Sequence, residues 1–293
     1  MKYKHINVCL CAYNAEAFIE KTINSILSQT YTHFTLFIVN DASTDGTKSI
    51  IEQFVKKDNR VVFIDLKKNI GTYAAKNLVL KEFAIGDFWA HHDADDYSDS
   101  KRFEKQIEYL EKFNLDGCGT AINEFYTDGI SPRIPSNFPL VLNNTDGFYY
   151  RANYYPEKIS TETVLDNIDD LAKLKIAMNG SLMFRLDLVQ QLGGFDGHTR
   201  FGADSDFLWR FITFYNFGNI QEVLYNRRFH GSSLTQSKKT GWNSDIRKKY
   251  ANEIKEKHIK RLKFLHENEK KLAWKHSVYD MFYPEVSYNI YKK

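Results

Sequence analysis

The sequence contains few cysteines and prolines and no long apolar run. Three cysteines and five prolines occur among its 293 residues. So odd and sparse a cysteine count argues against a disulfide framework and favours a reducing compartment. No apolar run reaches the roughly 18 residues that a membrane-spanning helix needs. The first apolar run is interrupted by Asn14 and Glu16, too early for a signal peptide, so we expect a cytoplasmic protein.

An excess of charge of one sign is also missing. The formal net charge is only +3, which is too small to make nucleic acid the main partner. The charge is unevenly spread, because residues 241–293 hold 13 Lys/Arg against 7 Asp/Glu and residues 1–240 are therefore net −3. We expect residues 237–293 to form a basic, helical C-terminal extension. Three interpretations stay open for it: a solvated helical surface, contact with an anionic partner such as the inner face of the membrane, or packing on the catalytic core or on another subunit.

Apolar residues make up 43% of the chain, enough for a sizeable core, and in the first 120 residues their spacing alternates between strand and helix periods. Strands are predicted at residues 6–12, 34–40, 60–66 and 86–92. Helices are predicted between them at about residues 15–27, 46–57 and 72–83. Since parallel strands need helical crossovers, this order predicts an α/β fold with a doubly wound, mainly parallel sheet that carries helices on both faces.

The pattern loosens after residue 120. Proline-containing loops with short strands are expected first. Further elements are then expected at residues 161–177 (helix), 179–185 (strand), 203–216 (amphipathic helix) and 243–272 (long polar helix).

Polar residues follow each of the first four predicted strands. Doubly wound sheets bind ligands beyond the carboxyl ends of their strands, so these residues are expected to converge on one ligand edge. They are Tyr13 and Asn14 after the first strand, Asp41 after the second, Asn69 and Gly71 after the third, and the segment "DADD" at residues 93–96 after the fourth.

The segment "DADD" places Asp93, Asp95 and Asp96 within four positions. Their mutual repulsion raises the cost of ionising any one of them, so the segment is either a solvated turn or a site for a compensating cation. A divalent cation held by one or two carboxylates and by nucleotide phosphates is the usual arrangement in phosphate chemistry. The position at the ligand edge favours a metal, Mn²⁺ or Mg²⁺.

Two segments of the second half add charged side chains. "GADSDFLWR" (202–210) puts Asp204 and Asp206 in the first turn of a helix, where carboxylates also have a structural role toward the helix dipole. "YNRRFHGSSLTQS" (225–237) is predicted as a loop that combines two arginines with His230. Guanidinium groups suit diphosphate oxygens.

Six segments resemble, in the same order, those of the family 2 glycosyltransferases of the GT-A fold, of bacterial surface-polysaccharide type. They are "CAYNAEAFIEKTINSILSQTY" (11–31), "VNDASTDGT" (39–47), "NIGTYAAKN" (69–77), "DADD" (93–96), "GGFD" with "GADSDFLWR" (193–210), and "RRFHGSSLT" (227–235). Two positions depart from the family pattern: Asn40 replaces the first Asp of the second segment, and Ala203 replaces the first acid of the family's "E-D" pair.

The resemblance implies a role for each matching residue. Asp41 would contact the nucleotide base, expected to be uracil, with Tyr13 packed nearby, and Asp204 would be the catalytic base, with Asp206 as the fallback. The nucleotide-binding residues would be Ala12, Tyr13, Asn14, Asp41, Asn69, Gly71, Lys76, Asp93 and Ala94. The metal would be bound by Asp95 and His230, with Asp93 and Asp96 as further candidates, and the diphosphate by Arg227 and Arg228.

The resemblance also implies an organisation and a reaction. Residues 1–120 would form the nucleotide-sugar-binding half of a GT-A domain, and residues 121–236 the acceptor-binding and catalytic-base half. The reaction would be a metal-dependent, inverting transfer of a sugar from a nucleotide-sugar, expected to be a UDP-sugar, to a hydroxyl of a saccharide or lipid-linked saccharide. The identities of the sugar, acceptor and linkage and the oligomeric state are not predicted.

Three other functions were weighed against the residues. A glycoside hydrolase would use Asp95 and Asp204 as its two carboxylates, but it would need no metal or nucleotide and would leave the polar loops of the sheet unexplained. A sugar nucleotidyltransferase typically carries a glycine-rich phosphate loop after the first strand, and "CAYNAEAF" is not one. A nucleotide-sugar-binding protein without turnover stays open because of Ala203.

Overall fold

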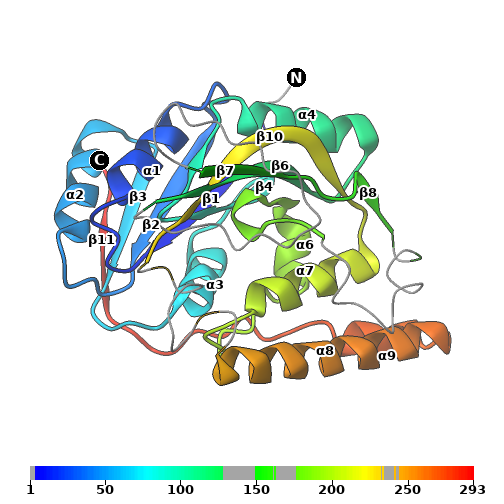
Figure 1. Ribbon diagram of the computed structural model, residues 1–293. Helices are drawn as coiled ribbons and strands as arrows, with labels where there is room; N and C mark the ends of the chain where they lie inside the picture. Colours follow the sequence, from blue (N-terminus) through cyan, green and yellow to red (C-terminus); the bar gives the residue numbers. More distant parts are fainter. Residues whose placement is uncertain are drawn as a thin grey trace.

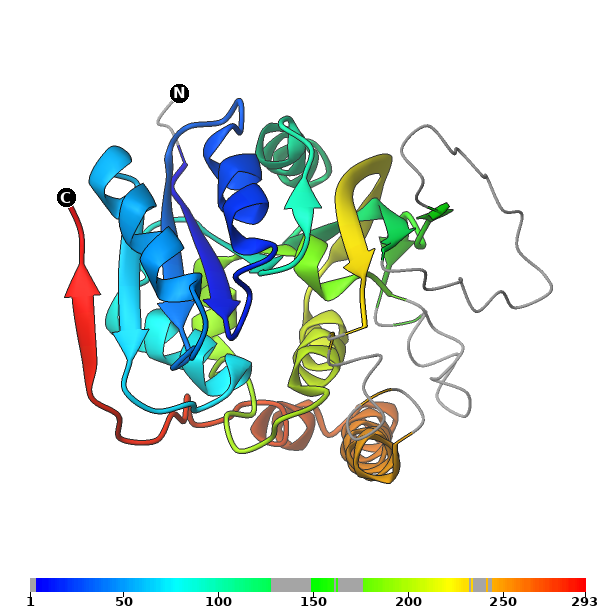
Figure 2. The same ribbon diagram turned by 60° about the vertical axis from the view of Figure 1, so that its left-hand side comes forward.

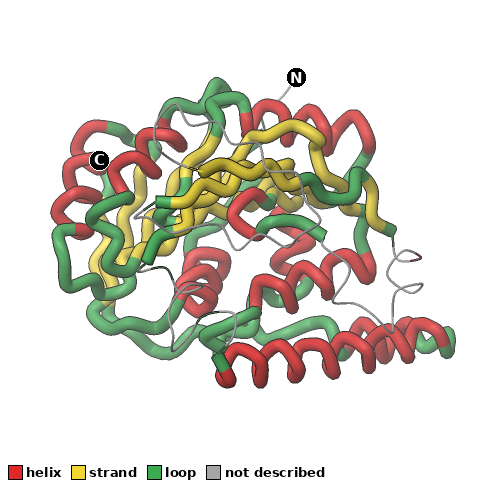
Figure 3. Tube along the Cα trace, viewed as in Figure 1, coloured by secondary structure: helices red, strands yellow, loops and turns green. Residues whose placement is uncertain are grey.

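The structure is a computed structural model that describes residues 4–127, 149–160, 162, 176–231, 233, 241 and 244–293 (Figure 1). Within these residues a mixed β-sheet lies between helices, as the colouring by secondary structure makes plain (Figure 3). The helix predicted at residues 161–177 falls almost wholly outside the described residues.

The strands follow the order β11-β3-β2-β1-β4-β9-β6-β10-β5 across the sheet, with β7 paired to β6 and β8 paired to β10. Their bounds are β1 Ile6–Ala12, β2 Phe34–Asn40, β3 Val61–Leu66, β4 Phe88–Asp93, β5 Tyr97–Ser98, β6 Gly117–Tyr126, β7 Tyr149–Asn153, β8 Lys158–Ile159, β9 Met183–Arg185, β10 Phe217–Phe229 and β11 Tyr288–Tyr291.

The four predicted strands form the parallel core of this sheet. Strand β1 pairs in parallel with β2 on one side and β4 on the other, and β2 pairs in parallel with β3. The predicted α/β fold with a mainly parallel, doubly wound sheet is thus confirmed. Strand β9 then joins β4 to β6 by antiparallel pairing, which makes the sheet mixed beyond β4.

Helices cover both faces of the sheet (Figures 1 and 2). The helices are α1 Ile19–Leu27, α2 Thr47–Lys57, α3 Thr72–Glu82, α4 Arg102–Phe113, α6 Leu186–Gln191, α7 Ala203–Phe214, α8 Asp245–His266 and α9 Lys270–Lys275, with a short 3₁₀ helix at Asn179–Ser181. One apolar cluster joins β1 to α1, α2 and α4, and a second joins the opposite face to α3, α6 and α7. Alternation along β1 feeds both, since Val8 belongs to the first cluster and Cys9 to the second.

The C-terminal residues do not form a purely helical extension. The predicted long helix is divided into α8 and α9, which lie outside α7 (Figure 1). After α9 the chain returns to the far edge of the sheet and adds β11, which pairs antiparallel with β3. The extension is therefore built into the sheet and the core, and the buried Leu262 of α8 belongs to the same apolar cluster as α7.

The segment of Arg227 and Arg228 is not a loop, as was predicted, but the end of β10. This long strand pairs with β6 over most of its length and with β5 at Tyr225 and Asn226, so its backbone is held as a strand despite its polar side chains. No helix in the described part of the chain has both the length and the apolar character required to cross a bilayer.

Candidate active site

The loop after β4 and the end of β10 bring Asp95 and His230 together. The Nε2 atom of His230 lies 2.9 Å from Oδ2 of Asp95. The Asp95 side chain is 30% exposed, whereas the imidazole of His230 is nearly buried against the ring of Phe18. The two predicted metal ligands therefore converge, and the carboxylate among them is open to a ligand.

Asp96 points the other way, into the protein. Its Oδ2 accepts a hydrogen bond of 2.8 Å from the Tyr225 hydroxyl, and its Oδ1 accepts one of 2.7 Å from the backbone N–H of Arg228. Burial raises the pKa of Asp96 well above its usual value, and the carboxylates of Asp95 and Asp93 raise it further. Because its oxygens are buried and already bonded, Asp96 fastens β10 to the acidic loop and is not available as the further metal ligand that was considered.

A buried arginine lies beneath the acidic loop. The guanidinium of Arg102 donates to Ser98 Oγ at 3.0 Å and to the backbone oxygen of His91 at 2.9 Å, and it lies over the Tyr225 ring. Burial lowers the pKa of Arg102 to about 10, and nearby groups that include Asp93 and Asp96 act against the shift, so the side chain stays charged at neutral pH. Part of the charge of the three aspartates is thus balanced from within the fold.

Asp204, in the first turn of α7, lies in the same site although it comes from the other half of the chain. Its Oδ2 accepts a hydrogen bond of 2.8 Å from Nδ2 of Asn179. The Tyr73 hydroxyl of α3 is hydrogen-bonded to the same carboxylate, and the pKa of Tyr73 is raised well above its usual value, first by burial and then by Asp204. Two neutral side chains therefore fix the direction of the candidate base.

Asp93 is close enough to Asp95 and Asp204 to be affected by their charges. Burial raises its pKa, the Lys76 ammonium opposes the shift, and the carboxylates of Asp95 and Asp204 add to it. Asp93, Asp95 and Asp204 thus form one acidic site faced by the buried Lys76, whose ammonium lies 5.4 Å from the Phe195 ring centroid.

Asp206, the fallback base, is turned away from this site. One oxygen lies 2.9 Å from Nε of Arg210, and the other lies 2.9 Å from Nη2 of Arg261 on α8. Burial would raise the pKa of Asp206, but the two guanidinium groups hold it below its usual value. Since both oxygens are buried in ion pairs, the structure removes Asp206 from the candidates for the base.

The loops after β2 and β3 are locked together by Asp41. Its two carboxylate oxygens accept hydrogen bonds from the backbone N–H groups of Ile70, at 2.7 Å, and Gly71, at 2.9 Å. Burial raises the pKa of Asp41, and these two donors act in the opposite direction. Arg200, from the second half, donates to Oδ1 of Asn69 at 2.7 Å and so closes over the same loop.

Asn14 has a comparable linking role. Its Oδ1 accepts a hydrogen bond of 2.8 Å from the backbone N–H of Thr44, and its backbone N–H donates to Ser43 Oγ at 3.0 Å. The neighbouring Tyr13 side chain is 54% exposed. An uncovered aromatic ring beside Ala12 at the ligand edge is a surface on which a flat base can stack.

The two arginines of β10 have partners in the protein. Arg228 donates from Nε to the backbone oxygen of Asp95 at 2.9 Å, and its guanidinium lies 4.9 Å from the ring centroid of Phe18. Nη1 of Arg227 lies 3.4 Å from Glu124. Both arginines border the acidic loop, and their binding of diphosphate stays a prediction.

The metal prediction can be tested against the donor atoms present. No three His, Cys, Asp or Glu side chains among the described residues form a ready-made metal cluster. Asp95 and His230 place a carboxylate oxygen, of the kind that Mg²⁺ and Mn²⁺ prefer, beside an imidazole nitrogen, and a cation bound by both would replace the hydrogen bond between them. This pair fits a cation whose remaining ligands come from a diphosphate and water.

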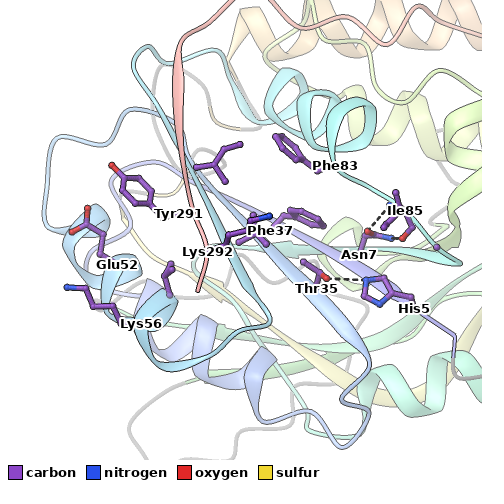
Figure 4. Close-up of a pocket in the computed structure, with 14 residues that line it drawn as sticks. His5, Asn7, Thr35, Phe37, Glu52, Lys56, Phe83, Ile85, Tyr291 and Lys292 are labelled. Atoms are coloured by element: carbon purple, nitrogen blue, oxygen red, sulfur yellow. Dashed lines mark hydrogen bonds between the residues drawn. The ribbon is translucent and has the colours of Figure 1, made fainter.

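A pocket of about 960 Å³ lies elsewhere, near the amino-terminal ends of the parallel strands (Figure 4). His5, Thr35 and Phe37 line it together with residues of β11, and Nε2 of His5 lies 3.1 Å from the Thr35 hydroxyl. Because doubly wound sheets bind ligands at the opposite ends of their strands, and because none of the predicted site residues lines this pocket, it is not the candidate active site.

Several residues of the site were not predicted from the sequence. Tyr73 lies inside the quoted segment "NIGTYAAKN", and its spacing gave no sign that it would reach Asp204. Asn179 and Arg102 come from segments without a motif, and Arg200 and Tyr225 lie in quoted segments that gave no sign of these contacts. The contacts of these four residues with Asp204, His91, Asn69 and Asp93, respectively, span 11 to 132 positions of the chain.

The sequence of this chain is similar to a known protein family and to individual glycosyltransferases. The description "Glycosyl transferase family 2" matches residues 7–172, more than half of the chain. The putative teichuronic acid biosynthesis glycosyltransferase TuaG of Bacillus subtilis is 39% identical over 105 residues, which cover 36% of this chain and 41% of that protein. The uncharacterized glycosyltransferase EpsJ of the same organism is 28% identical over 242 residues, 79% of this chain and 63% of that protein. The chain spans from about two fifths to under two thirds of the length of the curated relatives named here.

Two solved structures share the fold. Staphylococcus aureus TarS 1–349 in complex with UDP-GlcNAc has a TM-score of 0.60 at 17% identity, over 89% of this chain and 72% of that one. The mannosyltransferase PcManGT from Pyrobaculum calidifontis, in complex with GDP-Man and Mn²⁺, has a TM-score of 0.52 at 18% identity, over 77% of this chain and 57% of that one. The resemblance found in the six sequence segments is thus confirmed, and the chain belongs to glycosyl transferase family 2.

Proposed function

We propose that the protein is an inverting, metal-dependent glycosyltransferase that moves a sugar from a nucleotide-sugar, expected to be a UDP-sugar, to a hydroxyl of a saccharide or lipid-linked saccharide. The observation that carries the proposal is that separate parts of the chain bring His230 against Asp95 and place both Asp95 and Asp204 near enough to Asp93 to raise its pKa. Support comes from structures of similar fold: TarS was solved with UDP and with UDP-GlcNAc, and PcManGT with GDP-Man and Mn²⁺.

On the donor side, Asp95 and His230 would hold Mn²⁺ or Mg²⁺ against the diphosphate. A divalent cation there would stabilise the negative charge that develops on the leaving oxygen. The buried Lys76 adds positive charge near Asp93. The exposed ring of Tyr13 would stack on the base, while Asp41 keeps the loop of Ile70 and Gly71 in place beneath it.

On the acceptor side, Asp204 would act as the general base. The acceptor oxygen forms a bond to the anomeric carbon as the bond from that carbon to the diphosphate oxygen breaks, and the bonding electron pair leaves with the diphosphate. The hydroxyl proton passes to Asp204, a contribution typically of about 10² to 10⁴-fold. Attack from the face opposite the leaving group inverts the anomeric carbon. Asn179 and Tyr73 would hold the carboxylate in the orientation needed for this attack.

One observation favours a second candidate, a nucleotide-sugar-binding protein without turnover. Ala203, which replaces an acid of the family pattern, is completely buried in the apolar cluster of α7. This chain therefore has a single acid, Asp204, where the family pattern has two. Binding of a nucleotide-sugar without transfer or hydrolysis would support the second candidate.

The test is the substitution Asp204→Asn. Asp99→Asn is the matched control, because Asp99 is exposed and lies three residues beyond the segment "DADD". We expect Asp204→Asn to keep UDP binding and to lose about 10² to 10⁴-fold of the transfer rate or of slow nucleotide-sugar hydrolysis. Asp99→Asn should behave like the wild type. An Asp204→Asn enzyme with full activity would remove Asp204 from the mechanism.

A further inference from the structure

A buried ion cluster lies on α7 directly behind the candidate base. Asp206 is two residues beyond Asp204 and is paired with Arg210 of the same helix and with Arg261 of α8, each at 2.9 Å. The side chains of all three charged residues are at most 2% exposed. The Tyr279 hydroxyl lies 3.3 Å from the Asp206 oxygen that Arg261 also contacts. Two cations are thus gathered around one anion, Asp206, which is two residues from Asp204 on the same helix.

The two arginines extend this cluster to the C-terminal end of the chain. Arg261 donates from Nε to the backbone oxygen of His276 at 2.9 Å and from Nη2 to the Tyr279 hydroxyl at 2.8 Å. Arg210 donates from Nη1 both to Leu192 and to Ser277, at 2.9 and 3.0 Å to their backbone oxygens. Residues 276–282, which we name the C-terminal strap, are therefore fastened to α7 and to the turn at residues 192–197.

Close backbone packing reinforces this attachment. A Cβ atom added to Gly193 would lie 1.6 Å from the backbone oxygen of Tyr279, and one added to Gly197 would lie 2.1 Å from that of Phe282. Asn77 of α3 donates from Nδ2 to the same Phe282 oxygen at 2.8 Å. The strap thus touches α3, the helix that supplies Tyr73 to the candidate base, as well as the turn that precedes α7.

We propose that Arg261 is a positioning residue for Asp204. Acting through Asp206, it fixes the first turn of α7 so that the Asp204 carboxylate stays directed at Asn179 and Tyr73. The first turn of a helix lacks part of its internal hydrogen bonds and frays unless other groups hold it. A buried, hydrogen-bonded ion pair holds it strongly, because separating its members leaves a charge buried without a partner. The catalytic part of this proposal rests on the proposed function.

Through Arg261, the C-terminal extension would take part in catalysis. Arg261 reaches Asp206, His276 and Tyr279 at once because its planar guanidinium carries several donors in fixed directions. A lysine supplies the charge from a single atom and cannot make all three contacts. Lysine should therefore replace Arg261 only in part.

The experiment compares Arg261→Gln with Leu262→Ala in the full-length protein. Leu262 is the adjacent residue of α8, fully buried in the apolar core, and its truncation destabilises the same helix without touching the ion cluster. Hydrogen exchange is measured for peptides that cover residues 202–208, and kcat, donor KM and UDP affinity are measured for each variant. Arg261→Lys and Tyr279→Phe serve as milder variants in case Arg261→Gln does not fold.

We expect Arg261→Gln to speed exchange at residues 202–208 and to lower kcat by about 10²-fold, the size of effect that a misplaced catalytic group produces, with donor KM and UDP affinity unchanged. Arg261→Lys and Tyr279→Phe should show smaller losses of the same kind. Leu262→Ala should lower the unfolding temperature and leave kcat near the wild-type value.

Equal exchange and equal kcat in Arg261→Gln and Leu262→Ala, or parallel losses of kcat and UDP affinity, would overturn the positioning role. The proposed function fails separately, if the wild-type protein transfers and hydrolyses no nucleotide-sugar. In that event unchanged exchange at residues 202–208 would still overturn the part of the proposal that assigns Arg261 to the first turn of α7, and faster exchange would uphold it.

Discussion

Replacing Asn40 by Asp restores the family's usual residue at this position and should destabilise this protein in a pH-dependent way. Asn40 is buried at the end of β2, and its Nδ2 donates to Oδ1 of Asp65 at 2.8 Å. Its own Oδ1 accepts from the backbone N–H of Ser43. In Asn40→Asp a carboxylate oxygen replaces the Nδ2 donor. The buried carboxyl groups of residues 40 and 65 then face each other at the same distance of 2.8 Å.

The size of the effect follows from this geometry. Two charges 2.8 Å apart repel by about 6 kcal/mol at an effective dielectric constant of about 20. Lys48, at 2.8 Å from Asp65, and Lys67, at 3.5 Å, offset part of this repulsion. The lost hydrogen bond adds about 1 kcal/mol. One of the two acids will take up a proton instead of staying charged, so the loss in the free energy of unfolding is smaller than the full repulsion, on the order of 3 kcal/mol.

The sign of the pH dependence is fixed by which state binds the proton. A carboxyl whose pKa is raised by folding lowers stability only where the unfolded chain is ionised, that is, above a pH of about 4. The loss in the free energy of unfolding therefore grows as the pH rises through that value and levels off above the raised pKa. In the wild type the pKa of Asp65 is shifted in the opposite direction. Burial would raise it, but Lys48 and Asn40 hold it below the usual value.

Urea unfolding at pH 5 and pH 8 measures this effect, with Asn40→Ala as the control that removes the hydrogen bond without adding a charge. We expect Asn40→Asp to lose clearly more stability at pH 8 than at pH 5, and Asn40→Ala to lose a similar, smaller amount at both. If Asn40→Asp lost the same free energy of unfolding at both pH values, charge repulsion would not be the cause of the loss.

Two further predictions concern the site itself. Gly180→Ala should reduce both UDP binding and transfer by at least about tenfold. The reason is that a Cβ there would lie 2.1 Å from the Tyr225 hydroxyl and 2.9 Å from Oδ2 of Asp93. UDP affinity and transfer rates equal to those of the wild type would contradict this prediction. Asn179→Ala should lower kcat by about tenfold with donor KM unchanged, because it removes the hydrogen bond to Asp204. If steady-state kinetics show that donor KM rises instead, Asn179 belongs to donor binding.

The parallel core could be predicted from the sequence because its signals are local. Apolar runs and helical spacing gave β1 and β2 at the residues observed, and the rule that ligands gather at the carboxyl ends of parallel strands placed Asp41 and Asp93 at the same edge. The joining of Asp204 to that edge came only from the family resemblance, since no local pattern links residues more than 100 positions apart.

The remaining features depend on long-range pairing, which spacing does not reveal. Arg227 was predicted in a loop because its segment is polar, but pairing with β6 holds it in a strand. Asp206 was a fallback base until its partner Arg261, 55 positions away, was located. Strand β11 has too few apolar residues to be recognised alone, and it exists because β3 offers an open edge.

The structure also shows how the charges of the basic C-terminal extension are placed. Lys248 and Lys249 of α8 lie 3.9 Å from the acids Asp245 and Glu253, so part of the positive charge is balanced along the helix surface. Arg261, which counted toward the positive charge of the sequence, is buried in an ion pair. Part of the extension thus packs on the catalytic core, one of the interpretations left open, and contact with an anionic membrane stays a prediction.

The central claim, that the acidic loop holds a cation against a nucleoside diphosphate, is tested most directly by calorimetric titration with UDP. The titration is done with and without Mn²⁺ on the wild type, Asp95→Asn and the control Asp99→Asn. We expect UDP binding that requires Mn²⁺ and is weakened at least about tenfold by Asp95→Asn alone. UDP binding that is unchanged by Asp95→Asn, or no UDP binding under any metal condition, would contradict the claim.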